Sequence, residues 1–284
     1  MSTYPRTGMQ RVLAGSTNPV LRATFRGQDG DPVDATGAVT CNLERVDGTV
    51  LATGRAATNP SGTGTYEVAL TTAEAAVLDV IKVGWFDGGV QRATTWHRIV
   101  GGFMFGIGEL QSKLGMAQFT AAQLRAERDR ITDLIERETG VAWCPQYDLE
   151  SFDGYGRLRH VTTWRPLRTV RSLQLDDVAV DVSGLRVDTP AGVFYSDQSL
   201  VGWTELGYEH GFDQPTEALR DAALIAAGDR LQREFSALSS RVRRSTNDMG
   251  MTVEYSFAGR DHPTGIDEVD AVIMAHDMRS PGFG

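Results

Sequence analysis

Five histidines and two cysteines are the side chains of this sequence best suited to metal binding, and their spacing argues against it. The histidines are His97, His160, His210, His262 and His276. They form no HExxH motif and no i, i+4 pair, which a zinc site built on one helix requires. Cys41 and Cys144 lie far apart, with no Cys or His at metal-ligand spacing beside either. We therefore expect no metal, ordinary histidines and small buried cysteines.

The sequence gives as little support for a catalytic nucleophile or a nucleotide-binding site as for a metal site. Cys144 precedes Pro145 directly after a helix stop, whereas a reactive thiol needs a helix N-terminus, a cation or a base to lower its pKa. No GxSxG elbow, P-loop or GxGxxG fingerprint occurs, and Gly106-Ile107-Gly108 lacks the third glycine. The sequence thus predicts a protein that is not an enzyme and carries no cofactor.

Acidic, aromatic and basic groups remain as candidate binding sites. Asp29, Asp31 and Asp34 can gather oxygen ligands for calcium, but the loop lacks the bidentate Glu of an EF-hand, so we interpret it as a solvated turn. The tryptophans on predicted strands can form a sugar-stacking platform, although core packing explains them more simply. These are Trp85, Trp96 and Trp203. The cluster 241–244 can touch nucleic-acid phosphates or simply suit a helix C-terminus.

Length and composition indicate a globular protein of about two domains. The 284 residues include 41 % hydrophobic and 23 % charged residues. Lys and Arg number 28 against 37 Asp and Glu, a net charge of −9, so contact with DNA or anionic lipid is expected to be local. The N-terminus does not read as a signal peptide, and the apolar stretch 99–108 is too short and glycine-rich to span a bilayer. We expect the chain to stay on the cytoplasmic side unless a particle carries it elsewhere.

Hydrophobic periodicity divides the chain into two parts. From residue 12 to about 100, short alternating runs separated by turns such as Asp47-Gly48 predict about seven strands, typical of an immunoglobulin-like sandwich whose core Trp85 can fill. The glycines between 101 and 106 predict a domain boundary, and this segment can act as a hinge for the sandwich. We therefore expect a first domain, 1–105, made of the sandwich and a glycine-rich linker.

The second part, 106–284, changes to helical spacing. Thr120 and Gln123 predict a capping box before a helix that Gly140 ends. Short strands follow between 143 and 211, then a helix over 217–238, a strand over 251–257 and a helix over 266–278. The predicted fold class is α+β with two domains, the second having about three helices and an inserted small β-sheet.

Four segments carry a resemblance to a known family. They are Ile135–Pro145 (IERETGVAWCP), which follows the helix, Arg165–Leu173 (RPLRTVRSL), Leu206–Pro215 (LGYEHGFDQP) and Thr264–Ile273 (TGIDEVDAVI). A glycine turn, 153–156, lies between the first two. In this order and spacing, the last 165 or so residues resemble the head-to-tail adaptor (connector) proteins of siphovirus-type tailed bacteriophages infecting actinobacteria. The sandwich lies outside the resemblance.

The resemblance implies a structural protein of the virion neck, made in the host cytoplasm. Such adaptors form a ring, usually of twelve copies, under the portal protein and present a platform for the head-to-tail stopper or tail-completion protein. Double-stranded DNA passes through the lumen without specific binding, which suits an excess of carboxylates. Charges beside Glu127 and Asp129 are candidates for contacts between subunits. These are Arg128, Arg130, Arg230 and Glu234.

The C-terminal segment of such adaptors commonly reaches into the portal, so residues 276–284 are expected to order on docking. The candidate portal contacts are Arg241, Arg243, Arg244, His276, Met278 and Phe283. Two other functions stay open. One is a carbohydrate- or receptor-binding phage structural protein acting through Trp85 or Trp96 of the sandwich, and the other is a thiol hydrolase using Cys144.

Overall fold

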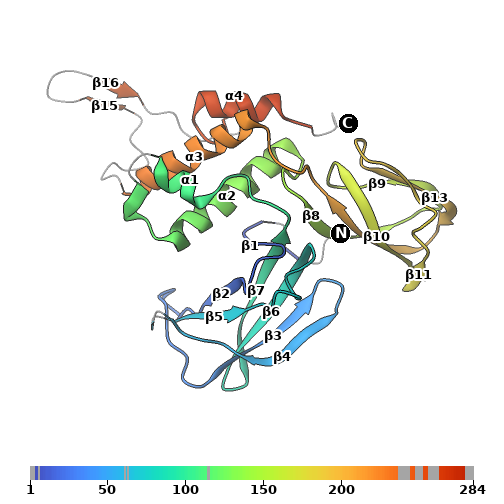
Figure 1. The fold of residues 1–284 in the computed structure, drawn as a ribbon, viewed down its shortest axis with the longest axis horizontal. Helices are drawn as coiled ribbons and strands as arrows, with labels where there is room; N and C mark the ends of the chain where they lie inside the picture. Colours follow the sequence, from blue (N-terminus) through green and yellow to red (C-terminus); the bar gives the residue numbers. More distant parts are fainter. Residues whose placement is uncertain are drawn as a thin grey trace. The chain divides into compact units, whose positions relative to one another are not determined.

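The structure is a computed structural model that describes residues 4–5, 7–60, 62, 64–113, 116–235, 244–246, 252–254 and 262–278. For 234–235, 244–246 and 252–254 only the backbone is described. The fold class is α+β with β-strands predominating, as predicted, and the described residues include four α-helices (Figure 1).

The chain forms two compact units, and each is built from two separate stretches. The first unit contains 1–102 and 144–213, and the second contains 103–143 and 214–284. The break after residue 102 lies close to the boundary expected between 1–105 and 106–284, but residues 144–213 of the expected second domain belong to the first unit. The reason is that the strands after residue 144 pack with the N-terminal strands and leave the helices as a unit of their own.

Seven strands of the first stretch form two sheets around one core. The bounds are β1 (Gln10–Leu13), β2 (Val20–Thr24), β3 (Val39–Arg45), β4 (Val50–Ala56), β5 (Thr65–Ala69), β6 (Asp79–Asp87) and β7 (Val90–Val100). One sheet has the order β1-β7-β6-β3-β4, with β1 parallel to β7, and β2 pairs with β5 in the other. Leu21 and Val68 from the small sheet meet Leu43 and Trp85 from the large sheet. Trp85 is fully buried, as predicted.

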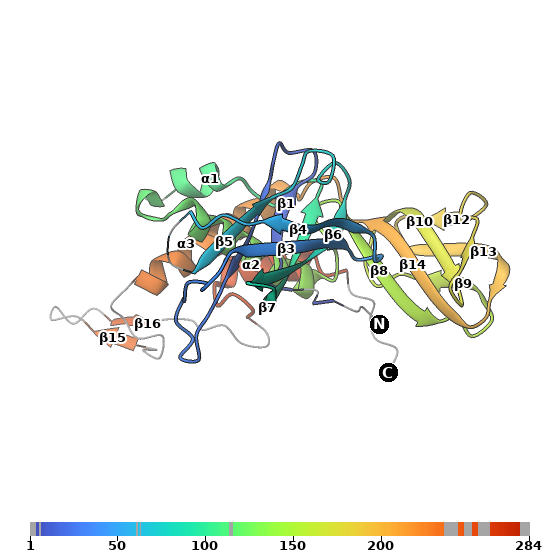
Figure 2. The same ribbon diagram turned by 90° about the horizontal axis from the view of Figure 1, so that it is seen from below.

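Seven further strands form the rest of the first unit (Figure 2). Their bounds are β8 (Gln146–Asp153), β9 (Arg157–Val161), β10 (Leu167–Leu175), β11 (Val178–Val180), β12 (Arg186–Asp188), β13 (Val193–Leu200) and β14 (Trp203–His210). Sheets of order β11-β10-β14-β8 and β12-β13-β9 enclose a core that includes Leu173, Phe194 and Leu206. The sequence pattern does not indicate β8, because Gln146 and Asp148 are buried polar residues and hide the alternation of a strand.

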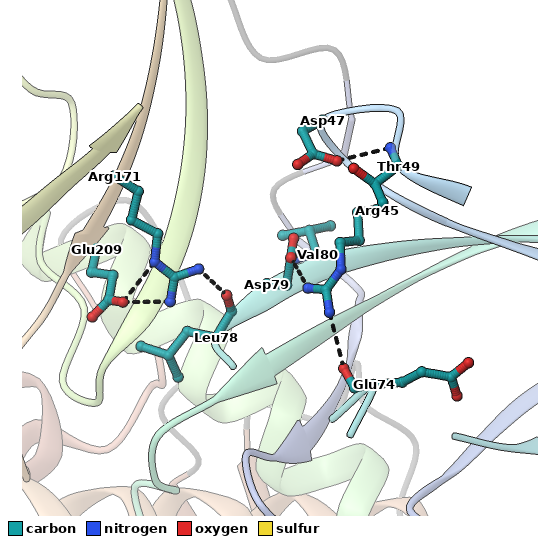
Figure 3. Close-up of polar contacts among 9 residues, drawn as sticks. All are labelled: Arg45, Asp47, Thr49, Glu74, Leu78, Asp79, Val80, Arg171 and Glu209. Carbon is teal, nitrogen blue, oxygen red and sulfur yellow. Dashed lines mark hydrogen bonds and ion pairs between the residues drawn. The ribbon is translucent and has the colours of Figure 1, made fainter. Parts of the chain in front are cut away.

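Polar contacts join the two strand groups within the first unit (Figure 3). Arg171 on β10 forms an ion pair with Glu209 and donates a hydrogen bond of 2.7 Å to the carbonyl oxygen of Leu78. Beside it, Arg45 pairs with the buried carboxylate of Asp79. Since Leu78 directly precedes β6, Arg171 ties the second strand group to the sandwich.

Gly101 permits a close approach between the end of the sandwich and Pro145. Its amide donates a 2.8 Å hydrogen bond to the Pro145 carbonyl oxygen. A Cβ at position 101 would lie 2.8 Å from Cβ of Pro145, so only glycine fits without a shift. The glycine-rich segment therefore fastens the sandwich to the start of the second strand group.

The second unit consists of helices, together with the short paired strands β15 (Arg244–Thr246) and β16 (Thr252–Glu254). The helices are α1 (Ile107–Ser112), the 3-10 helix η1 (Met116–Gln118), α2 (Ala121–Thr139), α3 (Glu217–Phe235) and α4 (Asp267–Ala275). The predicted capping box of Thr120 and Gln123 is confirmed, and Gly140 ends α2 in the left-handed conformation, with φ of 71°. Helix α3 packs against α1, α2 and α4.

Candidate interface surfaces

The charged residues of α2 that were expected to contact a neighbouring subunit are engaged within the chain. Arg128 is 4 % exposed, forms a 2.9 Å ion pair with Asp129 and places its guanidinium 3.4 Å from the ring centroid of Phe103. Arg230 on α3 lies 2.8 Å from the carboxylate of Glu127 on α2. Helical charge periodicity alone does not distinguish a contact between two helices of one chain from a contact between subunits.

The remaining predicted interface residues have varied placements. Arg130 is exposed on α2, and Glu234 belongs to α3, with its side chain outside the described residues. Arg244 begins β15, of which only the backbone is described. Arg241, Arg243 and Phe283 lie outside the described residues.

His276, a predicted portal contact, is held inside the second unit. Its Nε2 atom lies 3.0 Å from Oγ1 of Thr216, and its Nδ1 atom lies 2.8 Å from the carbonyl oxygen of Val272. Its ring also meets Trp143 edge-on, with centroids 5.5 Å apart. Both nitrogen atoms have intrachain partners, so His276 joins the end of α4 to the start of α3.

Met278, another predicted portal contact, lies three residues beyond the end of α4 and continues an exposed apolar stripe of that helix. Met274 is 53 % exposed and Met278 is 51 % exposed, and Ala271 and Ala275 are exposed beside Met274. Ala271, Met274 and Ala275 follow the i, i+3, i+4 spacing of one helix face, and Met278 extends this set of four residues past the helix end. We call them the α4 stripe. The buried face of α4 carries Val269 and Ile273 instead, so this helix is apolar on two sides.

The apolar residues of the α4 stripe can be read from the sequence, but only the last of them, Met278, was predicted to contact another protein. The other three residues of the stripe were not distinguished from the apolar residues that face the core in the same predicted helix. They are Ala271, Met274 and Ala275. A second apolar face, beyond the one that the core needs, is the signal that identifies such a surface.

The IERETGVAWCP segment closes α2 and anchors the C-terminal helix. Glu136 accepts a hydrogen bond from the amide of Trp143, and the Trp143 indole donates a 3.0 Å bond to Oγ1 of Thr139. The carbonyl oxygen of Thr139 in turn accepts a 2.9 Å bond from the amide of Met278. The segment therefore holds the end of the α4 stripe against α2.

The RPLRTVRSL and LGYEHGFDQP segments pair with each other. They form β10 and β14, in which Leu167 lies opposite His210 and Val170 opposite Tyr208. The Tyr208 hydroxyl donates a 3.1 Å hydrogen bond to the carboxylate of Glu150 on β8. These segments consequently build the sheet that carries the second strand group.

Glu150 lies at the centre of a buried polar group. Its carboxylate accepts a 2.6 Å bond from the Thr163 hydroxyl, and Nε2 of His160 lies 3.7 Å away. Burial alone would raise the pKa of Glu150, but His160 and the hydrogen bonds from Thr163 outweigh it and hold the pKa at about 2. Glu150 is therefore a structural carboxylate that stays ionised at neutral pH.

The TGIDEVDAVI segment begins α4. Asp270 is 2 % exposed, and its carboxylate accepts hydrogen bonds from the Thr264 amide and hydroxyl and from the Gly265 amide. The side chain thereby fixes the turn that directs the chain into α4. All four segments that carry the resemblance thus have structural roles.

The residues considered for catalysis or sugar binding are mostly buried. Cys144 is 2 % exposed, and burial raises the pKa of the Cys41 thiol to about 11, so Cys41 is not a thiolate at neutral pH. Trp85 is fully buried and Trp96 stacks on Tyr4 with centroids 5.6 Å apart. Trp85 therefore cannot form the proposed stacking platform. Trp203 is 55 % exposed, which contradicts the expectation that it packs in the core.

The remaining sequence motifs show no further site in the described part. Asp34, from the possible calcium loop, accepts hydrogen bonds from the Gly64 amide and the Asn59 side chain. Within the described ranges, His, Cys, Asp and Glu side chains nowhere gather in a group of three suited to a metal ion. No helix of the described part combines the length and apolar character that crossing a membrane requires.

Comparison with known proteins adds no assignment. The chain matches no protein-family model, and a search of curated proteins gives no match either.

Proposed function

We propose that this chain is a head-to-tail adaptor of a siphovirus-type phage, a structural protein of the virion neck. Copies of the chain form a ring, usually of twelve, between the portal protein and the stopper or tail-completion protein. Double-stranded DNA passes through the lumen of the ring. The chain acts mechanically in this proposal and catalyses no reaction.

The α4 stripe is the observation that carries the proposal. An exposed apolar face on a helix whose other face is already buried costs solubility, and such a face is typical of a surface that another protein covers. The stripe includes Met278, and Met side chains adapt to partners of varied shape. In a ring under a portal, either a sibling subunit or the portal covers this stripe.

The roles of the four resembling segments give independent support. They hold the end of α2, the β10–β14 pair and the start of α4, which are the joints that define the fold. Residues with such roles keep their order and spacing in proteins that share a fold, so these segments support a shared architecture with the adaptor family.

The N-terminal sandwich is immunoglobulin-like in this proposal. Its support is the order β1-β7-β6-β3-β4 opposite β2-β5, together with the parallel pairing of β1 and β7. In immunoglobulin-type sandwiches, two antiparallel sheets likewise enclose a core with a buried tryptophan. We infer that this part decorates the neck, on the outside of the ring.

The test is assembly on the portal, followed by electron microscopy of the purified protein with and without portal rings. We expect a ring on the portal for the unaltered chain. Met274→Lys places a charge in the α4 stripe and should prevent ring formation without changing the thermal unfolding temperature, because the side chain is exposed. Ala126→Lys, which places the same charge at an exposed position of α2 away from the stripe, is the matched control.

Two results would overturn the proposal. One is a ring that forms equally well with Met274→Lys and with Met278→Lys. The other is the absence of this chain from purified virions in quantitative mass spectrometry.

A further inference from the structure

The strands β15 and β16 form a sheet of their own within the second unit. They pair antiparallel over three positions, from Arg244 opposite Glu254 to Thr246 opposite Thr252. In the described part of the chain, no third strand pairs with either of them. The outer edge of each strand is therefore open to a further strand.

A pair of strands of this kind is not stable by itself. Two strands alone are at best marginally stable in water, and a third strand or a helix packed against them is needed. Within the described residues, β15 and β16 pack with each other and form no comparable contact with a helix or another strand. The pair therefore lacks the support that further strands would supply.

The connection between α3 and α4 is also far longer than these helices require. The two helices pack against each other, and neighbouring helices are commonly joined by about 2–8 residues. The chain between Phe235 and Asp267 exceeds this length several times and contains β15 and β16. Connections much longer than about 12–15 residues in compact proteins are usually functional or disordered. Because this one contains a strand pair, a functional role is favoured.

Rotation about a ring axis converts such a pair into a continuous sheet. The two strands run in opposite directions, so β16 of one copy and β15 of the next copy are antiparallel when the copies stand side by side. One repeated contact then covers both edges of every copy, and a closed ring leaves no edge free. A two-fold dimer, or a single strand from another protein, would cover only one of the two edges. The open edges therefore fit neighbouring copies in a ring better than either alternative.

The charges of the strand pair suit the same repetition. Arg244 and Glu254 occupy the same level of the pair, one on each strand. If the register continues from copy to copy, Glu254 of one copy lies next to Arg244 of the following copy, and opposite charges alternate around the ring. Opposite charges at facing positions of a sheet stabilise the pairing, whereas like charges destabilise it.

We propose that β15 and β16 of adjacent copies pair and form one antiparallel sheet around the ring. This inference rests on the proposed function, because it needs the ring, and it names a contact that holds neighbouring copies together. It places Arg244 between two copies of this chain, whereas the resemblance implied a contact with the portal. A portal strand on the same edges is the alternative that the test must exclude.

Cysteines at the two facing positions test the contact. One variant carries Arg244→Cys and another carries Glu254→Cys, and the native Cys41 and Cys144 are buried. Rings assembled on the portal from a mixture of both variants should give a disulfide-linked dimer on oxidation, because facing Cβ atoms lie about 4.5–5.5 Å apart. Rings of either variant alone should give at least tenfold less, since equal positions of neighbouring copies lie two strands, or about 10 Å, apart.

The matched control is a mixture of Arg244→Cys with Ala126→Cys, which places the second thiol at an exposed position of α2. This mixture should give no more linked dimer than Arg244→Cys alone. Mass spectrometry of the linked peptides identifies the two positions that are joined.

Amide hydrogen exchange of the unaltered chain provides a second readout that needs no substitution. Residues 244–246 and 252–254 should exchange rapidly in the free protein, because an isolated strand pair opens easily. In the ring on the portal, exchange at these positions should be at least about tenfold slower, because added strands supply backbone partners.

Two results would overturn the inference while leaving the adaptor proposal standing. One is a ring in which these amides exchange as fast as in the free protein. The other is a ring in which the amides are protected but the mixed variants give no more linked dimer than each variant alone, which would assign the edges to the portal. If no ring forms on the portal with the unaltered chain, the adaptor proposal fails as well, so the two failures are distinguishable.

Discussion

Buried carboxylates organise this protein at the scale of single residues. Glu150 collects hydrogen bonds from Thr163 and Tyr208, and Asp270 collects three from the turn before α4. A carboxylate that accepts several hydrogen bonds in a buried position contributes to stability only while it is ionised. Glu150, whose pKa is lowered to about 2, and His97, whose pKa burial lowers to about 3, therefore link the stability of the fold to pH.

Glu150 should make the protein sensitive to acid. Its pKa in the folded chain is about 2, below the ordinary value of 4.5, so its contribution is fully present above pH 4.5 and is lost as pH falls toward 2. Glu150→Gln should lower the unfolding temperature at pH 7 and flatten its dependence on pH between about 4.5 and 2. Thermal melts across this range measure the effect. A variant whose acid dependence parallels that of the unaltered chain would contradict it.

Helix α4 depends on a side chain from its own first turns. Asp270→Ala removes the acceptor for the Thr264 and Gly265 amides in a buried position, which typically costs about 1–3 kcal/mol. The unfolding temperature should therefore fall. Asp267→Ala, an exposed change at the first residue of the helix, is the control and should have a much smaller effect. Equal losses for both variants would show that the buried contacts of Asp270 are not what holds the helix start.

Two glycines of adjacent elements should respond oppositely to the same substitution. Gly101→Ala places a Cβ 2.8 Å from Pro145 and should destabilise the chain, by about 1–3 kcal/mol in the manner of overpacking. Gly108 in α1 has open space around its Cβ position, so Gly108→Ala should be neutral or stabilising by up to about 1 kcal/mol. Chemical denaturation of both variants provides the comparison. A harmless Gly101→Ala would restore the hinge interpretation.

Elements with local signals were predictable from the sequence, and those defined by distant contacts were not. The capping box at Thr120 and the left-handed Gly140 give α2 bounds that need no tertiary information. Strand β8 was not predicted, because its polar residues are buried by partners that are distant in the sequence. An example is Tyr4, which contacts Asp148.

The grouping of the sandwich with the strands after residue 144 is the main feature of the molecule that periodicity did not reveal. Hydrophobic patterning defines strands one at a time and does not indicate which strand groups share a core. Tyr147 and Leu149 on β8 pack with Val80 of β6 and with Tyr4 in one apolar cluster. A unit boundary does fall in the glycine-rich segment, after residue 102, but periodicity did not indicate that 144–213 return to the first unit.

Removal of the sandwich should damage the second half of the chain. A protein of residues 106–284 lacks Tyr4, Leu78 and Val80, so Tyr147, Leu149 and Arg171 lose their partners. We expect this truncated chain to be poorly soluble or to unfold at a clearly lower temperature than the full chain. Arg171→Ala in the full chain should give a smaller loss in the same direction. A truncated chain as stable as the full one would support two independent domains.

The interleaving of the two units also orders their completion during synthesis. The chain leaves the first unit after residue 102, returns at 144 and leaves again after 213. When the sandwich emerges from the ribosome, Tyr147 and Leu149 of β8 are yet to be translated, so the apolar surface around Val80 is only partly covered. Chaperones or neighbouring nascent chains thus have access to this apolar surface until roughly half of the protein has been made.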